Sequence, residues 1–255
     1  MASISTRMRH AASLIALCGW PLAAACTGTV YLTLDTGSMK PAEEIRAILI
    51  KHKVRATFFI ANEKTLRGDT ALDPAWAPYW KSLAADGHAF GSHTWRHWYF
   101  RRDLAAGKVA YISPAGVVEP MDKSNVCAEL DRANQAFAKL TGRAMDPIWR
   151  APGGRHTPRT LALAKSCGYE HIGWSDAGFL GDELASETHP NKQLLSRALA
   201  KIRDGDILMM HLGIRSRKDP FWPMLDPLIA GLKQKGFCFA TIPERGPPPE
   251  RKASQ

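Results

Sequence analysis

Four short apolar segments of this sequence each end in, or run directly into, a residue that can do chemistry. These residues are Asp35, His93, Arg150 and His211, and the segments are Val30–Leu34, Ala89–Ser92, Pro147–Arg150 and Asp206–Met210. In parallel α/β folds, functional sites form where the carboxyl ends of the strands meet. Any one of these residues alone would more often have a structural role, but the set of four predicts a functional site.

The residue types in this set indicate acid–base chemistry assisted by a metal ion. His93 and His97 are four residues apart, which predicts that both lie on one face of a helical turn and converge on one metal ion. Asp35 is a candidate metal ligand or general base, and His211 is a candidate general acid. Arg150 is suited to orient a carboxylate through paired hydrogen bonds.

The elements that must position these residues alternate along the chain. The predicted strands are Val30–Leu34, Ala56–Ile60, Ala89–Ser92, Pro147–Arg150, His171–Ser175, Asp206–Met210 and Phe237–Thr241. The predicted helices are Ala42–His52, Pro74–Ala85, Asn125–Leu140, Pro158–Ser166, Asn191–Ile202 and Trp222–Lys235. This alternation predicts a parallel α/β fold, either an open doubly wound sheet or a (β/α) barrel. The segment Trp98–Lys123 interrupts the pattern and is predicted to be an inserted loop.

The N-terminus has the pattern of an export signal. Arg7 and Arg9 precede a short apolar run, which ends in the A-x-A pattern Ala23-Ala24-Ala25. We therefore expect a signal peptide over residues 1–25, a catalytic domain over 26–244 and a disordered tail over 245–255, with the mature protein periplasmic or secreted. A lipid anchor on Cys26 and a buried N-terminal helix are the alternatives.

The cysteine count agrees with export. Beyond the signal, the chain has four cysteines, Cys26, Cys127, Cys167 and Cys238. In an exported protein they permit two disulfides with three pairings, or remain buried thiols. None has the C-x-x-C spacing of a zinc ligand set.

Composition excludes several function classes. The 255 residues are 45% hydrophobic and 23% charged, proportions typical of a globular protein. No apolar stretch reaches the roughly 18 residues that span a bilayer, so we expect no stable membrane insertion. The net charge of +10 favours anionic partners such as an acidic wall polymer. No nucleic-acid-binding motif, G-x-G-x-x-G or Walker motif is present, so we expect neither nucleic-acid nor nucleotide binding.

The motifs at these strand ends resemble those of the NodB-type polysaccharide deacetylases, which are metal-dependent carbohydrate esterases. YLTLDTG at 31–37 resembles the family's TFDDG motif, and GHAFGSHTWRH at 87–97 resembles GHEIGNHTxxH. WRAPGG at 149–154 resembles FRPPYG, GYEHIGWSDA at 168–177 resembles the strand with the family's Trp and Asp, and GDILMMH at 205–211 resembles GxIxLLH. The motifs also follow the family's order, and the resemblance implies a distorted (β/α) barrel.

The resemblance implies a role for each matching residue. His93 and His97 match the metal-binding histidines, Asp35 the base, Arg150 the arginine that holds this base, and His211 the acid that protonates the leaving amine. Gly153 falls where a backbone N–H binds the oxyanion, a role that needs no side chain. Trp174 and Met209 fall near positions that shape the acetyl pocket.

Two positions depart from the family's pattern. Thr36 replaces a metal-binding aspartate, and a neutral hydroxyl is a poor substitute for a carboxylate on a divalent cation. We therefore expect weaker metal binding, or a carboxylate from elsewhere in the site. The aspartate that polarises His211 is either Asp176 or Asp182, with a slight preference for Asp182.

The sequence thus predicts a hydrolase that removes N-acetyl groups from an amino-sugar polymer such as peptidoglycan or chitin, using a divalent metal, zinc. The expected partner is an N-acetylated polysaccharide or oligosaccharide. Thr36 also motivates an alternative, a degenerate member that binds glycans without catalysis. A third hypothesis is a deacylase of another small amide.

Overall fold

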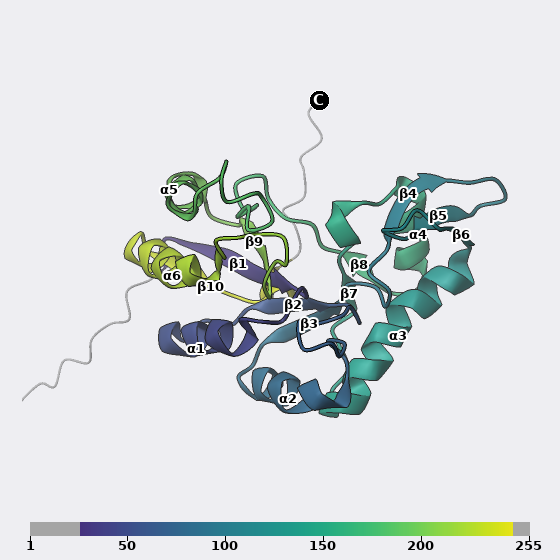
Figure 1. Cartoon of the computed structure of the whole chain (residues 1–255), viewed down its shortest axis with the longest axis horizontal. Coiled ribbons are helices and arrows are strands. Elements are labelled where there is room, and N and C mark those ends of the chain that lie inside the picture. Colours follow the sequence, from purple (N-terminus) through teal and green to yellow (C-terminus); the bar gives the residue numbers. More distant parts are fainter. Residues whose placement is uncertain (1–25, 247–255) are drawn as a thin grey trace, which may run out of the picture.

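Strand β1 (Gly28–Asp35) lies at the centre of the sheet and has three parallel neighbours. Strand β2 (Thr57–Ile60) pairs with Thr33–Asp35, β9 (Ile207–His211) pairs with Tyr31–Asp35, and β10 (Phe237–Phe239) pairs with the first residues, Gly28–Val30. Strands β3 (Ala89–Ser92), β7 (Ile148–Trp149) and β8 (Glu170–His171) continue the parallel sheet beyond β2. The carboxyl ends of all these parallel strands therefore lie at the same end of the sheet. The computed structural model describes residues 26–246 (Figure 1).

The chain after β8 makes single backbone contacts with β9, so the sheet curves into a distorted barrel that is not fully closed. The Ser175 amide donates a hydrogen bond to the Ile207 carbonyl (3.1 Å), and the Met209 amide donates to the Gly178 carbonyl (2.9 Å). Gly178 permits this approach, because a Cβ atom there would lie 1.9 Å from the Ile207 carbonyl oxygen. The barrel expected from the sequence is confirmed, and the open doubly wound alternative is wrong.

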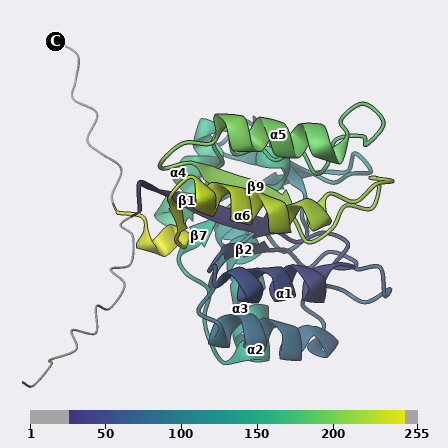
Figure 2. The same cartoon turned by 90° about the vertical axis from the view of Figure 1, so that its left-hand side faces the viewer.

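The helices lie outside the barrel (Figure 2). They are α1 (Ala42–His52), α2 (Ala77–Ala85), α3 (Lys123–Thr141), α4 (Pro158–Ser166), α5 (Asn191–Lys201) and α6 (Leu225–Gln234). Two predicted helices are each a short 3-10 turn followed by an α-helix, with the turns at Pro74–Trp76 and Trp222–Met224. The outward-facing strand residues, such as Leu32, Phe58 and Leu208, pack in the main core with apolar residues of the helices.

The segment Trp98–Lys123 is not a loop, so this prediction is wrong. It forms an antiparallel sheet of β4 (Tyr99–Asp103), β5 (Val109–Ile112) and β6 (Val118–Met121) beside the barrel, at the right in Figure 1. Phe100, Val109 and Tyr111 are fully or almost fully buried, in a second core that also contains residues of α3 and α4. Packing against distant elements stabilises these short strands, and a local sequence pattern does not reveal it.

Two disulfides use all four cysteines of the described chain. Cys26 pairs with Cys238 and joins the start of β1 to β10, and Cys127 pairs with Cys167 and joins α3 to the end of α4. The Cys26 pair is incompatible with a thioether lipid on the same sulfur.

Two predictions concern the ends of the chain, a signal peptide and a disordered tail. The predicted signal peptide, residues 1–25, lies outside the described residues, as do residues 247–255 of the predicted tail. No helix within residues 26–246 combines the length and apolar character needed to cross a bilayer.

Candidate active site

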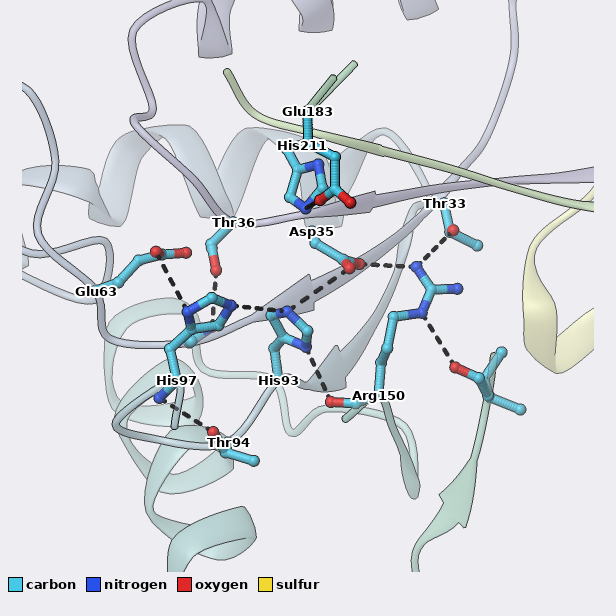
Figure 3. Close-up of polar contacts among 12 residues, drawn as sticks. Thr33, Asp35, Thr36, Glu63, His93, Thr94, His97, Arg150, Glu183 and His211 are labelled. Atoms are coloured by element: carbon cyan, nitrogen blue, oxygen red, sulfur yellow. Dashed lines mark hydrogen bonds and ion pairs between the residues drawn. The ribbon is translucent and has the colours of Figure 1, made fainter. Parts of the chain in front are cut away.

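A buried ion pair joins the end of β1 to the end of β7. Arg150 Nη1 lies 2.8 Å from Asp35 Oδ1 and 2.8 Å from Thr33 Oγ1. Arg150 also donates through Nε to the Ile172 carbonyl and through Nη2 to the Gly173 carbonyl. Arg150 is fully buried and Asp35 is 2% exposed. This network binds one oxygen of Asp35 and leaves Oδ2 for other partners (Figure 3).

Strand alternation explains why Thr33 and Asp35 both face Arg150. Residues two apart on a strand point to the same side of the sheet. Burial alone would raise the pKa of Asp35, but the positive charge of Arg150 and the nearby rings of His93 and His211 hold it below its usual range. Asp35 is therefore ionised at neutral pH.

The two histidines follow β3 in a loop rather than in a helical turn, which corrects the prediction about their local structure. Thr94 and His97 have left-handed φ angles of 63° and 56°, and no helix accommodates such residues. The Thr94 hydroxyl accepts a hydrogen bond from the His97 amide (3.1 Å) and lies 2.9 Å from the Tyr111 hydroxyl. These contacts hold a strained backbone, a feature that clusters at functional sites.

The loop still brings the two rings together. His93 Nε2 and His97 Nε2 are 3.2 Å apart, and Asp35 Oδ2 lies 3.6 Å from His93 Nε2. His93 Nδ1 donates to the Arg150 carbonyl (2.9 Å), so Nε2 of this ring carries a lone pair when the ring is neutral. Burial lowers the pKa of His93 to about 3, which keeps the ring neutral and able to bind a cation.

The distance between the two Nε2 atoms tests whether a metal fits. Two imidazole nitrogens about 2.0–2.1 Å from a tetrahedral zinc ion lie roughly 3.3 Å apart. The observed 3.2 Å fits two such ligands. Within residues 26–246, no three His, Cys, Asp or Glu side chains share the arrangement of a complete metal site. His93 and His97 can thus hold one divalent ion as two of its ligands, and no acidic residue among the described residues completes the set.

Thr36 occupies the position where the resemblance implies an aspartate. Its side chain is 1% exposed, and its hydroxyl accepts a hydrogen bond from the Ala61 amide (3.1 Å). This contact ties the hydroxyl to the backbone after β2. Thr36 adds no negative charge to the site.

His211, at the end of β9, is held by Asp182. The His211 amide donates to Asp182 Oδ2 (2.7 Å), and His211 Nδ1 lies 3.2 Å from Asp182 Oδ1. Asp182 is 3% exposed, whereas Asp176 is exposed on the surface, so Asp182 is the partner of His211. Burial alone would lower the pKa of His211, but the negative charge and hydrogen bond of Asp182 outweigh it and raise the pKa to about 9.

The three predicted substrate-binding residues lie in or beside the segments that carry Arg150 and His211. Gly153 lies in the turn Pro152–Gly154 next to Arg150, and a Cβ atom on Gly153 would lie 3.0 Å from the Tyr99 ring. The Trp174 ring lies near the Arg150 guanidinium, 5.6 Å from its carbon to the ring centroid. Met209 is 2% exposed and precedes His211 by two residues on β9, so both face the barrel interior.

Three further residues of the site were not predicted from the sequence. Thr33 binds Arg150, Glu63 Oε2 lies 3.7 Å from His97 Nδ1, and Glu183 Oε2 lies 3.9 Å from His211 Nε2. Strand periodicity contains a signal for Thr33, because it precedes Asp35 by two residues. For Glu63, the only signal is that an acidic residue follows β2 by three positions.

Comparisons with known proteins agree with this arrangement. A family model described as polysaccharide deacetylase matches residues 24–172, which is more than half of the chain. A peptidoglycan-N-acetylmuramic acid deacetylase of Bacillus subtilis is 25% identical over 84% of this chain and 70% of its own length. A chitooligosaccharide deacetylase of Azorhizobium caulinodans is 23% identical over 84% of this chain and 93% of its own.

Solved structures share the fold. A family 4 acetyl xylan esterase from Clostridium thermocellum, in complex with a cobalt ion, has a TM-score of 0.66 at 19% identity, over 85% of this chain and 89% of its own. A CE4 family pseudoenzyme from Bacillus anthracis has a TM-score of 0.64 at 20% identity over 85% of this chain. This chain spans only 64% of that protein's length. With the ordered motifs and the barrel, the family match shows that this chain belongs to the polysaccharide deacetylase family.

Proposed function

We propose that this protein is a metal-dependent hydrolase that removes N-acetyl groups from an amino-sugar polymer, of the peptidoglycan or chitin type. The observation that carries the proposal is that an ionised Asp35 and a protonated His211 lie opposite each other on adjacent strands. Two converging histidines lie beside them. A proton acceptor and a proton donor are what amide hydrolysis requires. The names of the similar deacetylases support an N-acetylated glycan as the substrate.

The metal in this proposal is zinc, held by His93 and His97, with Thr36 at the third position. When bound, a divalent ion lowers the pKa of a water molecule and polarises the amide carbonyl. Asp35 takes the proton of the attacking water at Oδ2, since Arg150 occupies Oδ1. Arg150 keeps Asp35 ionised until it takes this proton.

The remaining residues act on the leaving group and on the substrate. The water oxygen bonds to the carbonyl carbon, the C–N bond breaks, and acetate and a free amine result. His211 donates its Nε2 proton to the departing amine, because its Nδ1 faces Asp182. The Gly153 amide stabilises the carbonyl oxygen as it becomes negative, and Trp174 and Met209 shape the acetyl pocket.

We place this activity outside the cytoplasm. The signal pattern of residues 1–25 and the two disulfides of the described chain support export to the periplasm or the medium. An N-acetylated wall polymer is found in the same compartment. The net charge of +10 favours an anionic polymer, and peptidoglycan is therefore the first substrate to test.

The experiment measures metal content and acetate release on the same purified sample of mature protein, with N-acetylglucosamine oligomers and with peptidoglycan. We expect zinc-dependent acetate release, and a loss of at least about 100-fold in Asp35→Asn, since general bases contribute roughly 10²–10⁴-fold. Asp176→Asn is the matched control, because this exposed aspartate should leave the rate unchanged.

The neutral Thr36 and the similarity to a pseudoenzyme favour a second candidate, a glycan-binding protein without catalysis. Glycan binding without acetate release, at any zinc concentration, would favour this candidate over hydrolysis. Acetate release from a small amide but from neither polymer would favour the third hypothesis.

A further inference from the structure

The site lacks a negative charge that the family resemblance implies. Thr36 is neutral, and its hydroxyl accepts from the Ala61 amide. Asp35 already shares its charge with Arg150 at 2.8 Å. The +2 charge of an ion held by two neutral imidazoles would therefore be poorly compensated by negative charge in the site. A carboxylate elsewhere in the site would restore the balance.

Glu63 is such a carboxylate, and the fold holds it beside His97. It lies in the loop after β2, where the Asn62 amide donates to the Trp95 carbonyl (2.9 Å) and the Ala71 amide donates to the Glu63 carbonyl (3.0 Å). The first contact joins this loop directly to the histidine loop. The position of Glu63 is thus determined by backbone hydrogen bonds on both sides.

The Glu63 side chain points at the ring nitrogen of His97 that faces away from His93. Glu63 Oε2 lies 3.7 Å from His97 Nδ1, whereas His97 Nε2 lies 3.2 Å from His93 Nε2 (Figure 3). The other oxygen, Oε1, is buried and has no hydrogen-bond partner among the described residues. A buried carboxylate oxygen without a partner is costly, and a bound ion or a role in the chemistry of the site is an established explanation for one.

We propose that Glu63 is a positioning residue for the metal site. Its carboxylate accepts a hydrogen bond from His97 Nδ1–H, holds Nε2 toward the metal and supplies the negative charge that Thr36 lacks. Carboxylate–histidine–metal arrangements of this kind orient the ring and strengthen its nitrogen as a ligand. A movement of roughly 1 Å converts the ion-pair distance into a hydrogen bond. The inference rests on the proposed function, because it concerns the metal of that site.

The first test is calorimetric titration of zinc into metal-stripped mature protein. Loss of such a partner weakens metal affinity by roughly 10–100-fold, and we expect this range for Glu63→Gln, which keeps the shape and removes the charge. Glu183→Gln is the matched control, because Glu183 Oε2 lies 3.9 Å from His211 Nε2 on the other side of the site. We expect the zinc affinity of this control to stay close to that of the wild type.

The second test separates positioning from a merely structural role. In the zinc-loaded wild type, the His97 Nδ1 proton should resonate downfield and exchange slowly in NMR spectra, because it is hydrogen-bonded to Glu63. In Glu63→Ala it should exchange with solvent and disappear, while the remaining spectrum and the thermal unfolding midpoint stay unchanged.

The outcomes distinguish this inference from the proposed function. Unchanged zinc affinity in Glu63→Gln, or equal weakening in Glu63→Gln and Glu183→Gln, would overturn the role of Glu63 alone. A His97 Nδ1 proton that exchanges equally fast with and without Glu63 would do the same. Absence of zinc binding in the wild type would overturn both the metal-dependent function and this inference.

Discussion

Asp35 and His211 are register partners on the adjacent parallel strands β1 and β9, and each has a buried counter-ion of its own. Arg150 lies 2.8 Å from Asp35, and Asp182 lies 3.2 Å from His211 Nδ1. The first pair keeps a carboxylate ionised, and the second keeps an imidazole protonated. The site therefore holds a proton acceptor and a proton donor at the same pH, which is the arrangement that acid–base catalysis needs.

Arg150→Met should reduce the free energy of unfolding by about 3–5 kcal/mol, because it leaves Asp35 buried without its counter-ion. The lowered pKa of Asp35 stabilises the native state above the unfolded-state pKa of the carboxyl, and this contribution is lost as the pH falls through the folded-state value. The difference between mutant and wild type should therefore shrink in acid. Urea unfolding at neutral and acidic pH measures it.

Arg46→Met is the control for this substitution. It breaks the pair of Arg46 with Asp86, whose side chains are 26% and 31% exposed, and should cost at most about 1 kcal/mol. An equal loss of unfolding free energy in Arg150→Met and Arg46→Met would contradict the proposal that burial makes the Arg150–Asp35 pair important.

The pH dependence of acetate release should follow the proton on His211. With a pKa of about 9, this donor is charged at neutral pH, and activity should fall as the pH rises through that value. Because the pKa is above that of an unfolded histidine, the proton also contributes stability below about pH 6.5, which is lost as the pH rises toward 9. Rate profiles and NMR titration of the His211 ring measure both effects.

Asp182→Asn should move the alkaline limb of this profile to lower pH, since burial lowers the pKa of His211 and the largest opposing charge, that of Asp182, is then absent. Glu183→Gln should move it less, because Glu183 is 47% exposed and 3.9 Å from the ring. An unchanged limb in Asp182→Asn would show that His211 is not the group being titrated.

His93→Ala and His97→Ala should each abolish zinc binding without unfolding the protein. The reason is that two ligands 3.2 Å apart act on the same ion, and losing either leaves a single imidazole. Zinc content after dialysis and circular dichroism of the same samples measure the two properties. His189→Ala, which removes a ring that contacts the Thr188 hydroxyl away from the site, is the control. Normal zinc stoichiometry in either site variant would refute this ligand assignment.

Thr36→Asp should raise the affinity for a divalent ion by about an order of magnitude, because affinity increases with the negative charge of the ligand set. Activity should be kept or increased if Asp35 remains free to act as the base. Thr36→Asn is the neutral control and should not gain affinity. Calorimetry that finds equal or weaker binding in Thr36→Asp would mean that another carboxylate already completes the site, with Glu63 as the first candidate.

The mature protein should contain no free thiol when it is denatured without reduction, because all four of its cysteines are paired. Replacing both Cys127 and Cys167 by serine should lower the free energy of unfolding by about 2–5 kcal/mol, since this bond closes a loop between residues 40 positions apart. Thiol titration and urea unfolding measure the two quantities. Four free thiols in the unreduced protein would reject both disulfides.

The sequence by itself determined several of the helices and strands and the chemical residues at the strand ends. Helices α1 and α4 and strand β3 have the predicted bounds, because their apolar periodicity and their start and stop residues are local features. Asp35, His93, Arg150 and His211 lie together because parallel strands bring their carboxyl ends to one mouth. This conclusion does not depend on the order of the strands in the sheet.

Only the tertiary structure decided which distant groups touch. Asp182 rather than Asp176 binds His211, and Glu63 faces His97, because chain segments far apart in sequence pack side by side. The same is true of the two disulfides and of the antiparallel sheet in Trp98–Lys123. The left-handed residues Thr94 and His97 replace the predicted helical turn because hydrogen bonds to Tyr111 and within the loop hold them there. Such contacts depend on three-dimensional packing, which residue spacing does not specify.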